Sequence, residues 1–160
     1  MNKVINILMG ICLISGISNA KSIEKSEEDE KLLALGIIGK DYKYLNHDKA
    51  LEYFRLQSNK LAKSLPIQVD SYTEFTSSMS TPDVSFYSYR FLKDLTKSQR
   101  IELVDSIRTE ENLKELCISF FDSRYLIANN HVFKVDYMDK SNKKLVDFTI
   151  DKKSCKSTIN

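Results

Sequence analysis

The chain has 160 residues, of which 24 are basic and 22 acidic, so its formal net charge is +2 at neutral pH. This near-balance gives no reason to expect nucleic acid or an anionic membrane surface as a partner. Only 4 glycines and 2 prolines are present, which argues against a loop-rich fold and against a Gly-rich phosphate loop. The length suits one domain with a sizeable core.

The first twenty residues, MNKVINILMGICLISGISNA, have the three parts of a secretory signal peptide. Lys3 lies in a short basic region, an apolar run follows, and the small residues Ser18 and Ala20 have the spacing that signal peptidase accepts. We expect cleavage between Ala20 and Lys21 and export to the periplasm or out of the cell. The apolar run is shorter than the roughly 20 residues of a membrane-spanning helix, so we expect no stable membrane span after the signal is removed.

Residues 21–45 are predicted to form an acidic N-terminal segment with a short helix over about 25–35. The acidic side chains are interpreted as a solvated face or a loose tail. They are Glu24, Glu27, Glu28, Asp29 and Glu30. The apolar run at 32–38 is either a docked helix or a partner-seeking segment, and the sequence alone does not decide between them.

Residues 46–160 are predicted to form one α+β domain. Its first helix should run to Pro66, with Asn46 or Asp48 as the N-cap. One face of this helix repeats at intervals of three to four residues. The repeating residues are Ala50, Leu51, Phe54, Ser58, Leu61 and Leu65.

The period then changes to two, which predicts a β-hairpin of 68–78 with 83–92 around a Pro82-Asp83 turn. Tyr87 and Tyr89 should lie on one face of its second strand. Phe86, Ser88 and Arg90 should lie on the other face.

Helices are expected again after residue 95. Thr96 with Gln99 is a capping-box pattern, Thr109 can cap a second helix, and Asn129-Asn130 suits a left-handed helix end. The first of these helices should carry an apolar stripe formed by Ile101, Val104 and Ile107.

A second hairpin, with its turn at Asn142, should close the chain. The predicted fold class is therefore α+β, with a four-stranded antiparallel sheet made of two hairpins and helices packed on one face.

Two cysteines, Cys117 and Cys155, remain once the signal and its Cys12 are removed. In an oxidising compartment an even pair most often forms a disulfide, and we rank this above a buried thiol. A catalytic thiol would need a base, and neither His47 nor His131 lies in a recognisable motif. The short Cys and His spacings of a metal site are missing, so no metal or other cofactor is expected.

Several segments resemble a group of small exported bacterial proteins. In that group a Leu-Pro-x-x-Val-Asp-x-x-Thr segment precedes a Tyr-x-Tyr strand and two late cysteines, as in LPIQVDSYT, FYSYRF and Cys117 with Cys155 here. The resemblance covers about residues 65–155. It implies the fold and the disulfide, and it transfers no catalytic residue.

Asp70, Arg90 and Arg124 are the polar candidates for ligand binding or for an ion pair. The simpler interpretation is that Asp70 caps the start of the hairpin and that the arginine heads reach water. The aromatic strand 86–91 is a candidate stacking surface, although such alternation usually marks a sheet with one buried face. No lipase, zinc-protease or nucleotide motif is present.

The favoured functional hypothesis is an exported, non-enzymatic protein that binds a protein partner. It would be an accessory factor of an envelope or secretion complex, or an immunity-type inhibitor. One alternative is a secreted enzyme or effector whose site is assembled from scattered residues such as His131, Asp136 and Arg124. The other is a structural envelope protein that self-associates through residues 32–39.

Overall fold

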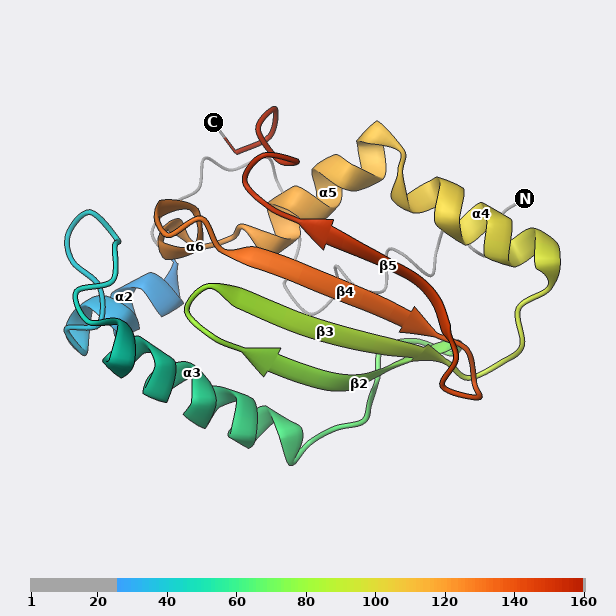
Figure 1. Cartoon of the computed structure of the whole chain (residues 1–160), viewed down its shortest axis with the longest axis horizontal. Helices are drawn as coiled ribbons and strands as arrows, with labels where there is room; N and C mark the ends of the chain where they lie inside the picture. Colours follow the sequence, from blue (N-terminus) through green and yellow to red (C-terminus); the bar gives the residue numbers. More distant parts are fainter. Residues whose placement is uncertain (1–25, 160) are drawn as a thin grey trace.

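The structure, a computed structural model, describes residues 26–159. The predicted signal peptide and its cleavage point between Ala20 and Lys21 lie outside these residues. The described part contains five helices and one five-stranded sheet (Figure 1). The helices are α2 (Glu27–Ala34), α3 (His47–Ala62), α4 (Lys97–Ile107), α5 (Glu110–Phe120) and α6 (Arg124–Ala128). The strands are β1 (Ile67–Gln68), β2 (Thr73–Ser80), β3 (Val84–Phe91), β4 (Val132–Met138) and β5 (Lys144–Ile150).

The strands lie in the sheet in their chain order, β1 to β5. The two predicted hairpins form, β2 with β3 and β4 with β5. They join through β3 and β4, which are parallel, with Val84 opposite Val132 and Arg90 opposite Met138. The prediction of a four-stranded, purely antiparallel sheet was therefore wrong in two respects, since β1 adds a short fifth strand and the sheet is mixed.

The helical segment between the hairpins explains the parallel junction. Residues 92–131 hold α4, α5 and α6, and they carry the chain from the end of β3 back to the end of the sheet where β3 began. A strand that re-enters a sheet after such a crossover runs parallel to its neighbour. Sequence alternation identifies each strand but does not reveal the direction in which the second hairpin docks.

The helices cover one face of the sheet, as predicted. Alternate residues of the strands point into the core, among them Tyr89, Phe91, Val135 and Tyr137, and the residues between them are half-buried or exposed. Figure 1 shows α3 along the β2 side of the sheet and α4 and α5 nearer β5. Side chains of α3 and α6 meet, as in the stacking of Phe54 on Tyr125, and the candidate site is a concavity lined by residues of α3, α5, α6 and the sheet.

The apolar segment at 32–38 is divided between the core and the surface. Leu32, Ile37 and Ile38 are buried against α3, α5 and α6. The segment is therefore docked within its own chain through these three residues, whereas Leu35 is 54% exposed.

The predicted helix faces agree with the structure in part. In α3, Ala50 and Phe54 are buried and Ser58 and Leu61 are half-buried, as predicted, whereas Leu51 is 44% exposed. In α4, Ile107 is buried and Val104 is half-buried, whereas Ile101 is 54% exposed. Spacing therefore found the side of each helix that faces the core, but it included one exposed residue in each.

Candidate functional site

A groove of about 380 Å³ lies between α3 on one side and α5 and α6 on the other, with the sheet as its floor. We call it the α3–α5 groove. Its lining residues come from α2, α3, α5 and α6 and from strands β2, β3 and β4. They are Glu28, Phe54, Leu61, Phe75, Ser80, Ser85, Tyr87, Tyr89, Ser119, Phe120, Asp122, Ser123, Tyr125, Leu126 and Phe133.

Aromatic residues are the largest group in the lining of this groove, and several of their rings are in contact. Tyr87 stacks on Phe120, with ring centroids 5.8 Å apart, and meets Phe75 edge-on at the same distance. Phe120 lies 4.8 Å from Phe133. Such interlocked rings form a rigid apolar surface, which is typical of sites that bind apolar ligands or side chains.

Hydroxyl groups form a polar spot on the floor, at the edge of β2 and β3. Ser85 Oγ lies 2.8 Å from Ser80 Oγ and 2.9 Å from Nε2 of His131. The other ring nitrogen of His131, Nδ1, lies 2.9 Å from the Pro82 carbonyl oxygen. Because a carbonyl only accepts, Nδ1 donates to it, and in the neutral ring Nε2 is then an acceptor. The single proton of the Ser85 hydroxyl can serve either Nε2 or Ser80 Oγ. Burial lowers the pKa of His131, although the Pro82 carbonyl and Asp83 oppose this, so the neutral ring is favoured.

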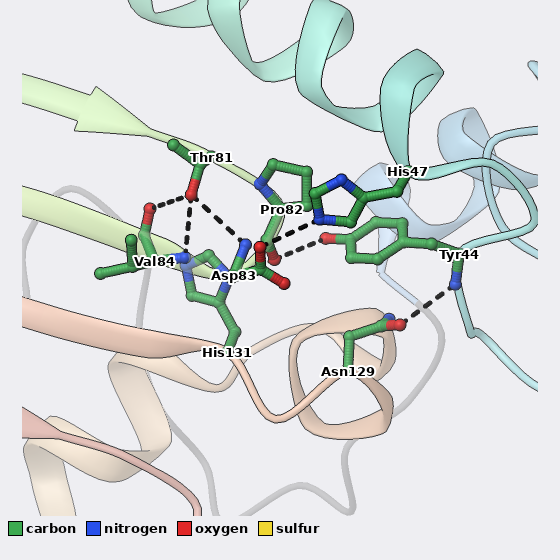
Figure 2. Close-up of polar contacts among 8 residues, drawn as sticks. All are labelled: Tyr44, His47, Thr81, Pro82, Asp83, Val84, Asn129 and His131. Carbon is green, nitrogen blue, oxygen red and sulfur yellow. Dashed lines mark hydrogen bonds and ion pairs between the residues drawn. The ribbon is translucent and has the colours of Figure 1, made fainter.

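The turn between β2 and β3 is fixed from both sides (Figure 2). Thr81 Oγ1 accepts from the backbone N–H of Val84 at 3.1 Å. The Tyr44 hydroxyl donates to the Pro82 carbonyl at 3.1 Å, and His47 Nε2 lies 2.9 Å from Asp83 Oδ2. Together with His131, these contacts attach the loop before α3 to the floor of the groove. The predicted Pro82-Asp83 turn is present, and both histidines of the chain contact it.

The charged residues of the lining, Glu28 and Asp122, are both acidic. They come from α2 and from the junction of α5 and α6. Burial raises the pKa of Asp122, the hydrogen bond from Ser123 opposes this, and the charges of Asp29 and Glu28 add to the rise. Asp122 nevertheless keeps contact with solvent, so it forms part of the rim rather than of the floor.

Asp29 is fully buried beside this rim and fixes its geometry. Its carboxylate accepts from the backbone N–H groups of Arg124 and Tyr125 at 3.0 and 2.9 Å, at the N-terminus of α6. It also closes the capping box of α2 with Ser26, whose hydroxyl donates to Ser123 at 2.9 Å. The interpretation of the acidic patch as a solvated face was therefore wrong for Asp29, which ties α2 to α6.

The three polar candidates from the sequence lie apart from the groove and from one another. Asp70 Oδ1 accepts from the backbone N–H groups of Tyr72 and Thr73, at 2.6 and 2.7 Å, at the start of β2. This is the structural role that the sequence offered as the simpler interpretation.

Arg90 and Arg124 also have defined contacts. Arg90 forms an ion pair with Glu74, directly across the β2–β3 ladder, and donates to Asn142 Oδ1 at 2.9 Å. Arg124 donates to the Tyr42 hydroxyl at 3.0 Å and lies over the Tyr42 ring. As binding residues all three remain predictions, because the structure does not bring them together.

The predicted disulfide is confirmed. Cys117 in α5 is bonded to Cys155, just after β5, and both residues are fully buried. The bond ties the helix that forms one wall of the groove to the end of the sheet.

Within residues 26–159, none of the helices is long and apolar enough to cross a membrane. Nor does that part of the chain gather three His, Cys, Asp or Glu side chains in an arrangement that could hold a metal ion.

The sequence did not predict the groove, although it predicted the elements that carry several of its lining residues. The alternation of Tyr87 and Tyr89 predicted a buried face, and Phe120 was placed on a helix. What could not be seen is that α3 and α5 stand apart over Tyr87 and leave its ring half-buried.

No protein-family model matches the chain, and no curated protein matches it. Solved structures do. A "putative secreted protein" from Pseudomonas aeruginosa matches with a TM-score of 0.50 and 13% identity, over 69% of this chain and 96% of that one. At this identity the likeness shows the fold alone.

Two pilotins of type II secretion systems match less closely. AspS from Vibrio cholerae has a TM-score of 0.47 and 11% identity, and EpsS from Vibrio vulnificus has 0.41 and 8%. Each covers 68% of this chain and 94% of its own.

Proposed function

We propose that this chain is an exported, non-enzymatic protein that binds an apolar segment of a protein partner in the α3–α5 groove. It would serve as an accessory factor of an envelope or secretion complex, or as an immunity-type inhibitor. The observation that carries the proposal is the groove itself, with its aromatic lining and its hydroxyl-bearing floor. The signal-peptide pattern of the first twenty residues supports export.

The groove suits side chains better than it suits bulk water. Its volume of about 380 Å³ can accept a few large apolar side chains, and each such side chain contributes about 1.5–3 kcal/mol when it is fully buried. The aromatic rings are already held by one another, so little conformational entropy is lost when they are covered. A preformed site of this kind favours a partner segment that docks without rearrangement of the protein.

The structural-protein alternative keeps only part of the segment on which it rested, since Leu35 is 54% exposed. Leu32, Ile37 and Ile38 are buried within the chain. The enzyme alternative loses its proposed constellation. His131 is buried between Ser85 and Pro82, Asp136 pairs with Lys144 at 3.1 Å, and Arg124 is bound to Tyr42.

One observation favours an enzyme of another kind. Ser85 lines the groove, and its hydroxyl lies 2.9 Å from a ring nitrogen of His131, which is the distance expected of a nucleophile and its base. Both side chains are almost completely buried, as a structural pair would be. A serine-directed fluorophosphonate probe separates the two cases, because only an activated Ser85 would be labelled, and the labelling would be lost in His131→Gln.

The binding proposal is tested with a pair of variants on α5. Ser119 lines the groove and is half-buried, whereas the adjacent Ile118 is 39% exposed and is not part of the lining. Ser119→Trp fills the groove with an indole, and Ile118→Trp adds the same group outside it. Each purified variant is used to capture partners from envelope and culture-supernatant fractions of the source organism.

We expect one stoichiometric partner to be retained by the wild type and by Ile118→Trp, and to be lost with Ser119→Trp. Near-ultraviolet circular dichroism verifies that both variants are folded. A partner retained equally by all three proteins would place binding elsewhere, and no partner in either fraction would refute the proposal.

A further inference from the structure

The rim of the α3–α5 groove is negatively charged on one side. Glu28 and Asp122 line it, and the Asp29 carboxylate lies close enough to Asp122 to raise its pKa. One cation lies at this rim beside Glu28, since Lys31 Nζ is 3.7 Å from Glu28 Oε2. Both of these side chains are substantially exposed, so solvent weakens the attraction between them.

The three carboxylates at this rim differ in the number of hydrogen bonds that they accept. Asp29 accepts three backbone hydrogen bonds, from Ser26, Arg124 and Tyr125. Glu28 accepts from the Tyr53 hydroxyl at 2.5 Å, and Asp122 accepts from the Ser123 hydroxyl at 2.8 Å and from its own backbone N–H. A carboxylate has room for about four hydrogen bonds, so Glu28 and Asp122 retain accepting capacity toward an incoming ligand.

We infer that the segment bound in the α3–α5 groove carries a lysine or arginine whose charged end meets Glu28 and Asp122. This inference rests on the proposed function and specifies the chemistry of the partner. The apolar stem of such a residue lies along the aromatic wall while its charged end stays at the rim. A segment without the basic residue covers the groove but leaves two partly dehydrated carboxylates uncompensated, which selects against it.

The charge pattern also fixes the orientation of the segment. Glu28 and Asp122 belong to the α2 and α6 side of the groove, whereas Leu61 and Phe75 line it elsewhere without any charge. The basic residue therefore lies at the α2 and α6 end, and the apolar residues of the segment extend over the remainder of the lining. Electrostatic attraction of this kind raises the association rate as well as the selectivity of a partner.

The test uses random peptides displayed on phage, selected against the full-length chain after export and purification with its disulfide formed. Enriched peptides are synthesised, and their dissociation constants are measured by fluorescence anisotropy against four proteins. These are the wild type, the double variant Glu28→Gln with Asp122→Asn, Ser119→Trp, and Ile118→Trp. A peptide with its basic residue replaced by methionine completes a double-mutant cycle.

We expect the enriched peptides to combine apolar residues with at least one lysine or arginine. The double variant should bind them about tenfold more weakly, the scale of a charge-assisted contact, and with a smaller salt dependence. The methionine peptide should lose a similar factor against the wild type and nothing further against the double variant. Ser119→Trp should not bind, and Ile118→Trp should bind like the wild type.

The two proposals fail in distinguishable ways. Peptides that are excluded by Ser119→Trp but bind equally well to the double variant would overturn the inference about charge and leave the groove as the binding site. Peptides that bind equally to Ser119→Trp, or a selection without any enrichment, would count against the groove and therefore against both proposals.

Discussion

His131 is the residue whose environment departs furthest from expectation. A histidine at the start of a strand would ordinarily lie at the surface, and here the ring is 1% exposed and bonded at both nitrogens. Because burial lowers its pKa, the folded chain takes up a proton on this ring at lower pH than the unfolded chain does. The unfolded ring is protonated below about pH 6.5, so the free energy of unfolding decreases as the pH falls below that value.

We expect His131→Gln to flatten this dependence between neutral pH and about pH 5. The variant should also be less stable by about 1–3 kcal/mol at neutral pH, since Ser85 and the Pro82 carbonyl lose a buried partner. Urea unfolding at a series of pH values measures both effects. Ser85→Ala retains the buried imidazole and should retain the slope, and an identical slope in wild type and His131→Gln would contradict this account.

At the scale of elements, the Asp29 side chain is the buried charged group that attaches α2 to α6, beside the hydrogen bond from Ser26 to Ser123. The Asp29 carboxylate accepts from the first backbone N–H groups of α6, which those residues cannot satisfy within their own helix. The negative charge also favours the positive end of the helix dipole. The position of Glu28 at the rim of the groove therefore depends on Asp29.

Asp29→Asn should lower the free energy of unfolding by about 2 kcal/mol, because an amide NH₂ group replaces one of the accepting oxygens. Glu27→Gln, an exposed change in the same turn, should be within about 0.5 kcal/mol of the wild type. Urea denaturation of both variants measures the difference. Equal losses would mean that general charge in the first turn, rather than the buried contact, holds α2.

Features that depend on neighbouring residues could be predicted, and features that depend on distant ones could not. The Thr96 and Gln99 capping box, the Thr109 cap and the left-handed Asn142 are local, and each is present. The partner of Asp29 lies in α6, far along the chain, and nothing near Asp29 in the sequence announces it. The parallel docking of β4 on β3 is non-local in the same way.

The disulfide acts on the whole molecule, since it closes the segment between Cys117 and Cys155. Removal of the bond enlarges the conformational freedom of the unfolded chain. The double variant Cys117→Ala with Cys155→Ala should be less stable by about 4 kcal/mol for a loop of this length. Its urea midpoint, compared with that of the oxidised wild type, measures the loss, and an unchanged midpoint would show that the bond is energetically neutral.

The parallel junction between β3 and β4 determines the order in which the sheet can assemble. Each hairpin closes locally, on a timescale of about 1–10 μs, whereas the junction requires closure of the whole of residues 92–131 and should form late. Tyr87 belongs to β3, and Phe133 belongs to β4, and both line the α3–α5 groove. The groove therefore exists only after the two hairpins have joined, so a partner that bound it, as proposed, would select molecules in which folding of the sheet is complete.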